Sequence, residues 1–284
     1  MLLRRTVVPS GPPERADLSL VSTKSFKMKY RLVRNYFAPM VNEWGLQDDT
    51  PSHGVLVRPC NFDCAFCNRT FIASDKYQEY SDDEFAMAVL NLLKDGTRFK
   101  FSGGEPTLDS TLEEKLSFVR QCGGKIFLDT NGSFPERVQS YLEKQLIDVL
   151  GVSLKGTTPE RACETARVKN SKICWDNPLS TIRLATQYPS TKIIVTYVFH
   201  DSDSYNTLTS FAKLLPYSQN LFLKMNNLYY DNDNHRVPGL KSLESELFVN
   251  LAEKFLKEHP EWRSKLILVE DEQAISHFDA IRFM

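Results

Sequence analysis

The sequence predicts an α/β fold, a partial (β/α)6 barrel in which six parallel strands alternate with helices. Short apolar segments rich in β-branched residues alternate with segments of helical periodicity from residue 53 onward. This alternation is typical of βα units joined by right-handed crossovers. Six units are too few for a closed eight-stranded barrel, so we expect an open one. The 284 residues, 42% of them hydrophobic, supply a full core.

Residues 1–50 are predicted to be an N-terminal extension that is partly helical. Gly11-Pro12-Pro13 interrupts any early helix. Apolar residues three or four apart predict a helix across residues 25–42; they are Phe26, Tyr30, Val33 and Phe37. The segment between Lys24 and Arg34 is basic, which is typical of a solvated helix face or, alternatively, of a partner surface or a cover over a binding site.

The predicted barrel core spans residues 51–230. Its expected strands are residues 54–57, 98–101, 125–129, 147–154, 193–199 and 221–228. Its expected helices are residues 110–122, 136–146 and 205–215, with further helical segments after residue 156. Another helix begins at Ser81, which forms a predicted capping box with Glu84, and ends near Gly96.

Residues 231–284 are predicted to be a C-terminal extension packed on the core. It contains an expected helix at residues 244–258 and an expected strand at residues 266–269. The sequence pattern does not place either element relative to the sheet.

The charges of the chain nearly cancel, with 35 basic and 36 acidic residues. We therefore expect no dedicated nucleic-acid surface, because such surfaces carry a basic excess or patch. No apolar run reaches the ~18 residues typical of a membrane span, and Leu2-Leu3 is too short for a signal peptide. Arg4, Arg5 and Ser10 weakly resemble a transit peptide, but an ordinary chain end is the favoured interpretation. The expected location is the cytoplasm, without membrane contact.

Polar residues follow directly after five of the predicted strands. They are Cys60 to Cys67, Gly103 to Glu105, Asp129 to Gly132, Ser153 to Lys155, and His200. Functional residues of parallel α/β folds gather at the C-terminal ends of the strands, so we expect these loops to converge on one mouth. His200 is better explained as a turn residue. Alternation along the last barrel strand places Lys224 and Asn226 on one face, toward the mouth.

Three of the six cysteines lie within eight residues of each other, namely Cys60, Cys64 and Cys67. Nothing marks the chain for secretion, so these thiols are better metal ligands than disulfide partners. Iron–sulfur clusters ordinarily take four cysteines, and three would leave one iron open to another ligand. Structural zinc is the alternative, with His53 as a fourth ligand, although His53 starts a strand and lies far along the chain from the loop. Cys122, Cys163 and Cys174 are expected to be small buried hydrophobic residues.

The cysteine triplet has the spacing C-x3-C-x2-C, and the aromatic Phe66 precedes its third cysteine. In this it resembles the signature of the radical S-adenosylmethionine (radical SAM) superfamily, over about residues 53–230. The resemblance implies a [4Fe-4S] cluster on Cys60, Cys64 and Cys67, whose open iron is chelated by S-adenosyl-L-methionine. It also implies one-electron cleavage of that cofactor to a 5'-deoxyadenosyl radical, which abstracts a hydrogen from a substrate. In such an oxidoreductase the protein binds and orients the cofactor and the substrate and excludes side reactions. We therefore assign no side chain a catalytic role.

The run Gly103-Gly104-Glu105-Pro106 is similar to the second motif of that family. Glycines let a backbone approach a ligand closely, and Pro106 biases Glu105 toward an extended conformation. In the family this edge hydrogen-bonds the amino group of the cofactor, so the resemblance implies cofactor contacts from Gly103, Gly104 and Glu105. A plain turn is the alternative.

Two later strand ends are similar to those of the glycyl-radical-enzyme activating enzymes, the branch that activates pyruvate formate-lyase. There an Asp-Thr-Asn-Gly run and an Asp-x-Lys run help hold the ribose and carboxylate of the cofactor, partly through a monovalent cation. The resemblance adds further cofactor-binding residues, which are Phe66, Asp129, Asn131, Ser153 and Lys155. Ser153 replaces the second aspartate, which argues against the cation. An ordinary turn at Asn131 and a solvated Lys155 are the alternatives.

The sequence leaves three hypotheses for the function. The first is an activating enzyme that takes hydrogen from a glycine of a glycyl-radical enzyme, and the strand-end patterns favour it slightly. The second is hydrogen abstraction from a small molecule or nucleotide precursor, anchored by Lys224, Asn226 and Asn227. This second hypothesis gains support because the chain has these residues at the place where the activating enzymes carry a Pro-Tyr-His-type motif. The remote third is a non-catalytic iron–sulfur protein. Both enzyme hypotheses imply a single-electron donor such as flavodoxin or ferredoxin.

Overall fold

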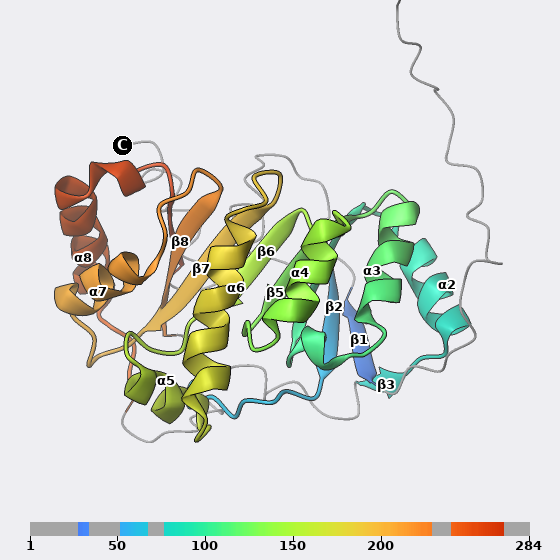
Figure 1. Ribbon diagram of the computed structural model, residues 1–284, viewed down its shortest axis with the longest axis horizontal. Helices are drawn as coiled ribbons and strands as arrows, with labels where there is room; N and C mark the ends of the chain where they lie inside the picture. The colour runs from blue at the N-terminus through green and yellow to red at the C-terminus, as the bar shows by residue number, and fades with distance from the viewer. Residues whose placement is uncertain (1–27, 34–51, 68–76, 229–239, 270–284) are drawn as a thin grey trace, which may run out of the picture.

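The computed structural model describes residues 28–33, 52–67, 77–228 and 240–269. These residues form one nine-stranded sheet in the order β3-β1-β2-β4-β5-β6-β7-β8-β9. Helices cover one face of this sheet (Figure 1). Each neighbouring pair from β2 through β4 to β9 is parallel, whereas β1 and β3 pair antiparallel at one edge. The α/β architecture and all six expected strands are confirmed.

The described residues form the following elements along the chain. The strands are β1 (Lys29–Val33), β2 (Ser52–Arg58), β3 (Gln78–Glu79), β4 (Arg98–Gly103), β5 (Lys125–Thr130), β6 (Val149–Ser153), β7 (Lys192–Phe199), β8 (Leu221–Asn227) and β9 (Leu266–Val269). The α-helices are α2 (Asp82–Leu92), α3 (Leu112–Gln121), α4 (Pro135–Glu143), α5 (Pro159–Ala166), α6 (Asn177–Ala185), α7 (Tyr205–Leu214) and α8 (Ser245–Glu258). The shorter helices are η4 (Pro106–Leu108), the π-helix η5 (Lys172–Asp176) and η6 (Pro260–Trp262). The predicted capping box of Ser81 and Glu84 begins α2.

The helix expected across residues 25–42 is wrong over its described part, because Lys29–Val33 form the strand β1. The spacing of Tyr30 and Val33 fits a helix, but the alternation of Lys29, Tyr30 and Arg31 also fits a strand. Pairing decides between them, since β1 pairs with β2 along its whole length and gives its backbone groups partners there. The rest of the predicted N-terminal extension lies outside the described residues.

The C-terminal elements continue the alternation of the barrel. Helix α8 leads to β9, which pairs parallel to β8, with Leu223 opposite Leu266. The sheet therefore has one more parallel strand than the six-unit barrel that we expected. No helix in the described residues is long and apolar enough to cross a membrane.

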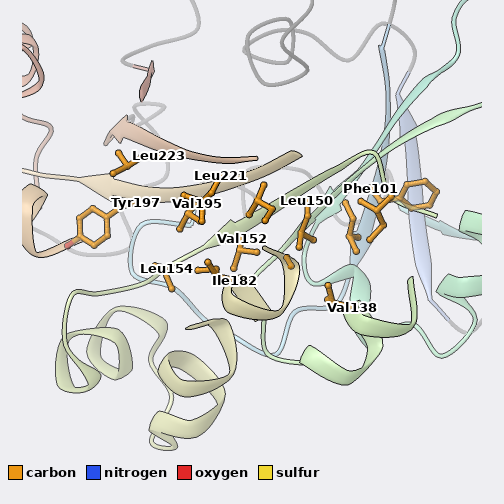
Figure 2. Close-up of a cluster of buried hydrophobic side chains, with 14 of the residues drawn as sticks. Phe101, Val138, Leu150, Val152, Leu154, Ile182, Val195, Tyr197, Leu221 and Leu223 are labelled. Atoms are coloured by element: carbon orange, nitrogen blue, oxygen red, sulfur yellow. The ribbon is translucent and has the colours of Figure 1, made fainter. Parts of the chain in front are cut away.

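The main core lies between the sheet and its covering helices. Figure 2 shows strand residues such as Leu150 and Val195 with the helix residues Val138 and Ile182. The opposite face of the sheet, which we call the inner face, carries a smaller apolar cluster that includes Phe127, Ile194 and Phe222. Side chains alternate between the two faces along each strand. Phe222 lies on the inner face and Leu223 lies in the main core. Lys224 and Asn226 therefore lie on the inner face with Phe222.

A buried ion pair connects the strand β1 to the loop after β4. Lys115 Nζ lies 2.6 Å from Asp109 Oδ2, and the two side chains are 1% and 3% exposed. The hydroxyl of Tyr30 on β1 donates to the same carboxylate. Burial lowers the pKa of Lys115 to about 8, although the charge of Asp109 opposes the shift. Lys115 therefore stays cationic at neutral pH, and the pair holds β1, η4 and α3 together.

Candidate functional site

The cysteine loop follows β2 and rests on the C-terminal end of α5. The backbone amide of Asp63 donates to Ala166 O over 3.1 Å, and that of Ala65 donates to Thr165 O over 2.9 Å. In Figure 1 the loop runs along the lower edge of the molecule toward α5. Because the last carbonyls of a helix have no partner within it, the loop amides supply the missing donors.

The three thiols differ in exposure. Cys60 is exposed, Cys64 is buried and Cys67 is half-buried. Burial raises the pKa of Cys60 to about 11 and also raises that of Cys64. Thiols of this kind are held as thiolates when a bound metal supplies positive charge.

The donor set fits a multi-iron cluster better than a single ion. A structural zinc ion takes four closed ligands, whereas this loop supplies three thiols. In a cluster each thiolate binds a different iron, so the sulfurs stand further apart. His53 does not join the thiols, because it is fully buried at the opposite end of β2, against the ring of Phe99. The zinc alternative therefore loses His53, the fourth ligand that the sequence offered for it.

Gly103 and Gly104 let β4 approach the start of the cysteine loop. A Cβ on Gly104 would lie 2.3 Å from Pro59 O, and one on Gly103 would lie 2.6 Å from Val57 N. The amides of Gly104 and Glu105 donate to Val57 O and Pro59 O over 2.8 and 3.0 Å. We expected these glycines to make room for a ligand, but the close approach is to the protein's own backbone. A side chain at Gly104 would therefore displace the residue next to Cys60.

The Glu105 side chain connects two loops at the mouth of the barrel. It is fully buried, and its carboxylate accepts bonds from Thr130 Oγ1 and Asn131 N, both over 2.6 Å. It also accepts a 3.0 Å bond from Thr107 N and a bond from the Thr107 hydroxyl. Burial raises the pKa of Glu105, whereas these hydrogen bonds lower it. The carboxylate thus ties the loop after β4 to the loop after β5, and its acceptor positions are used within the protein.

A second group of polar side chains ties the cysteine loop to the loop after β5. Asn131 Nδ2 donates to Asn61 Oδ1 over 2.8 Å, and Asn61 Nδ2 donates to Ser133 Oγ over 2.9 Å. Asn177 of α6 donates to Ser133 O over 2.8 Å. The predicted site residue Asn131 therefore positions the cysteine loop directly. Sequence analysis missed Asn61 and Ser133, and the only available signal was that Asn61 adjoins Cys60.

Asp129 lies on the inner face at the end of β5. Its Oδ2 accepts a 3.0 Å bond from Ser102 Oγ and lies 3.7 Å from Lys100 Nζ. A side chain at the neighbouring Gly151 would meet Asp129 Oδ1 at 2.9 Å. The carboxylate is half-buried, with 26% of its side chain exposed. It therefore combines a fixed position with access from the mouth.

Lys155, after the end of β6, faces the cysteine loop. Its Nζ lies 5.7 Å from the centre of the Phe66 ring, and its charge lowers the pKa of Cys64 against the larger effect of burial. Ser153 is half-buried at the end of the same strand. The structure thus brings together Phe66 and Lys155, which are far apart in the sequence.

His200 lies in the turn after β7, as expected. The amide of Asp203 donates to His200 O over 2.8 Å, and Arg161 of α5 reaches both His200 Nε2 and Asp203 Oδ1 at 2.9 Å. Burial lowers the pKa of His200, although Asp203 opposes the shift. These residues join the end of β7 to α5.

The last barrel strand has Lys224 and Asn226 on its inner face. Lys224 is 6% exposed, and within the described residues Asn226 Oδ1 is buried without a hydrogen-bond donor. Asn227 points the other way and pairs with the backbone of Leu243, donating to its O and accepting from its N, both over 2.9 Å. Asn227, which we expected as a third substrate anchor, is therefore engaged in holding the segment before α8.

Comparison with known proteins supports one family. A protein of Methanocaldococcus jannaschii named as a glycyl-radical enzyme activating enzyme is 27% identical over 42% of this chain and 45% of its own length. An S-adenosylmethionine-dependent nucleotide dehydratase of Lacinutrix mariniflava is 31% identical over 41% of this chain and 26% of its own length. The chain thus matches less than half of each relative.

In structure, the chain is similar to SuiB of Streptococcus suis bound to S-adenosylmethionine, with a TM-score of 0.56 and 16% identity over 75% of this chain and 48% of SuiB. That likeness shows the fold. The family model of the radical SAM superfamily matches residues 55–215, more than half of the chain. The chain therefore belongs to the radical SAM superfamily, whose enzymes use a [4Fe-4S] cluster and S-adenosyl-L-methionine.

Proposed function

We propose that Cys60, Cys64 and Cys67 hold the cluster, and that the ends of β4, β5 and β6 hold the cofactor beside it. When bound and reduced, the two together supply a 5'-deoxyadenosyl radical that abstracts a substrate hydrogen. The protein's own residues bind and orient the cofactor and the substrate, and they exclude water from the reaction. This role is supported by the arrangement of the ends of β4, β5 and β6 around the loop of thiols that follows β2.

The cofactor contacts are assigned by chemistry and position. Lys155 is suited to pair with the carboxylate of the cofactor, because it lies beside the thiol loop and charge-assisted bonds to carboxylates are strong. Asp129 is suited to accept from ribose hydroxyls, because Ser102 and Lys100 leave part of the carboxylate accessible. Phe66 is suited to pack beside the cofactor, since its ring already lies near Lys155. At Gly103 to Glu105 only the backbone edge is assigned, because the Glu105 carboxylate is used internally.

For the substrate we favour a small molecule that carries an anionic group. The observation that carries this choice is the pair Lys224 and Asn226 on the inner face of β8. Lys224 is 6% exposed on this face, and a lysine ammonium group is suited to pair with an anionic group of a ligand. Asn226 Oδ1, buried without a donor in the described residues, suits a ligand N–H or O–H group. The likeness to a nucleotide dehydratase agrees with such a substrate.

The added strand β9 supports the same choice. A protein substrate must thread a loop into the mouth, and a six-stranded barrel would leave an open edge for it. In this chain β9 occupies the edge beside β8. The strand-end patterns alone favoured an activating enzyme. With Lys224 and Asn226 on the inner face, we favour a small-molecule substrate instead.

An activating enzyme remains the second candidate. The relative from M. jannaschii favours it, as do Asp129 and Lys155, which match that branch at two separate strands. Its partner would be a glycyl-radical enzyme.

One experiment separates the two candidates. The anaerobically reconstituted, reduced enzyme is incubated with cofactor and either a small-molecule extract or co-encoded proteins. We expect 5'-deoxyadenosine formation to rise with the anionic part of the extract. The Lys224→Met variant should lose this rise but keep the slow uncoupled cleavage, whereas Lys213→Met, an exposed lysine on α7, should behave as wild type. A glycyl-radical doublet in the electron paramagnetic resonance spectrum of a co-encoded protein would instead establish the activating enzyme.

A further inference from the structure

Two cysteines outside the cluster triplet touch each other. Cys163 Sγ of α5 lies 3.2 Å from Cys174 Sγ of the π-helix η5. The sequence predicted both as separate buried hydrophobic residues. Cys174 is buried, but Cys163 is half-buried, and both are free thiols. Contact between a reachable thiol and a buried one is the arrangement of an attacking and a resolving cysteine.

This thiol pair lies against the cysteine loop. Cys174 packs in one hydrophobic cluster with Phe62 and Cys64, and Cys67 and Cys163 border the same cluster. The carbonyls of α5 that accept the loop amides follow Cys163 by two and three residues. A π-helix is a rare form that often marks a functional position. Here it brings Cys174 to α5, so the pair links the support of the loop to the segment that leads into α6.

We propose that Cys163 and Cys174 form a reversible disulfide by exchange with a low-molecular-weight disulfide such as glutathione disulfide. The Cys163 thiolate attacks one sulfur of the reagent, and the other sulfur leaves as a thiolate. Cys174 then attacks the mixed disulfide at Cys163, and the second reagent thiol leaves. The protein pair loses two electrons and two protons, and the reagent gains both as two thiols.

The order of attack is set by exposure. Cys163 is the accessible member. Burial raises the pKa of Cys174 to about 12, and the contact with Cys163 adds to that shift. The buried Cys174 therefore attacks second, losing its proton as it attacks the mixed-disulfide sulfur that Cys163 holds beside it.

Such a disulfide would act on the support of the cysteine loop without using the cluster ligands. It would join α5 to η5 across the turn of Arg167, which also pairs with Asp63 of the loop over 3.3 Å. Under oxidising conditions this disulfide would form next to the cluster, while Cys60, Cys64 and Cys67 would still bind iron.

The test is thiol mapping of the reconstituted protein. The protein is incubated anaerobically with glutathione disulfide, blocked with N-ethylmaleimide and cut with trypsin, which separates the two cysteines at Arg167, Lys169 and Lys172. Blocking is done in denaturant, where all six cysteines are accessible, so we expect the alkylated thiols to fall from six to four. The peptides of Cys163 and Cys174 should be linked, with Cys122 alkylated.

Two variants make the outcome specific. Cys174→Ala should stop at a stable glutathione adduct on Cys163, whereas Cys163→Ser should leave Cys174 unmodified. Cys122→Ser is the control and should form the link as wild type does. Alkylation of Cys163 and Cys174 at every reagent concentration, or an adduct on wild-type Cys163 that never resolves, would overturn the proposal. Iron content and uncoupled cofactor cleavage, measured on the same samples, report the proposed function separately.

Discussion

The two sides of the barrel mouth are built in different ways. On the side of β2, β4 and β5, polar side chains satisfy one another: Glu105 accepts from Thr107, Thr130 and Asn131, and Asn131 in turn binds Asn61. On the side of β8, Lys224 and Asn226 project from the inner face, and Asn226 lacks a donor within the described residues. A side that satisfies itself fixes the geometry of a resident group, whereas a buried acceptor without a donor, such as Asn226 Oδ1 within the described residues, suits a visiting ligand. We therefore associate the first side with the cluster and cofactor, and the second with the substrate.

The largest expected effect is the loss of any one cluster ligand on the first side. Changing Cys60, Cys64 or Cys67 singly to alanine should abolish the visible absorbance of the cluster and all cofactor cleavage, because each thiolate is expected to hold a different iron. Wild type should bind about four irons per chain after anaerobic reconstitution. Cys122→Ala is the matched control and should keep both. A triplet variant with full iron content would break the assignment.

The next effect concerns the ion pair that supports the same side. Lys115→Met should lower the free energy of unfolding by about 3–5 kcal/mol, because it leaves Asp109 charged and buried without its partner. Lys213→Met, on the exposed surface of α7, should change it by less than about 0.5 kcal/mol. Denaturant unfolding at neutral pH measures both.

The pH dependence sharpens this prediction. Lys115 and the hydrogen bond from Tyr30 outweigh burial and hold the pKa of Asp109 below its usual range, which lies near about 3.9. The stabilisation from the Asp109 carboxylate is therefore fully present above about pH 4 and is lost as the pH falls through the lowered value. The difference between wild type and Lys115→Met should shrink below about pH 4. A difference that stayed constant down to acid pH would show that the loss comes from packing alone.

A third effect tests how closely β4 and the cysteine loop depend on each other. Gly104→Ala places a Cβ 2.3 Å from Pro59 O, so the loop must shift, at a cost of about 1–3 kcal/mol or more. We expect impaired cluster assembly together with weaker cofactor binding. Gly123→Ala is the control, because Gly123 has a φ of +83° but nothing within 4 Å of an added Cβ. It should reduce stability through backbone strain alone and leave iron content unchanged. Normal iron content with lost cofactor binding in Gly104→Ala would instead indicate direct contact of Gly104 with the cofactor.

Sequence reasoning succeeded where a pattern is local and failed where a partner is distant. The strands and the Ser81 capping box were predictable because periodicity and cap chemistry act within a few residues. The strand at Lys29–Val33 was missed because its pairing with β2 lies outside its own sequence window. The position of Glu105 was predicted from its motif, but two of the partners of its carboxylate come from 25 and 26 residues further on. The contact of Cys163 with Cys174 depends on a π-helix, which has no sequence signal of its own.

The smallest expected effects separate two adjacent residues of β8. Asn227→Ala should cost about 1–3 kcal/mol of stability, because it leaves the amide and carbonyl of Leu243 without their partner. It should leave the substrate KM unchanged. Asn226→Ala should do the reverse, because its side chain lies on the inner face and its Oδ1 has no donor to lose within the described residues. We expect its unfolding free energy to stay within about 0.5 kcal/mol of wild type, while KM for the anionic substrate rises and uncoupled cofactor cleavage is unchanged. If Asn227→Ala changed KM and Asn226→Ala did not, the outer side of β8 would face the substrate, and the division of the mouth into a cofactor side and a substrate side would fail.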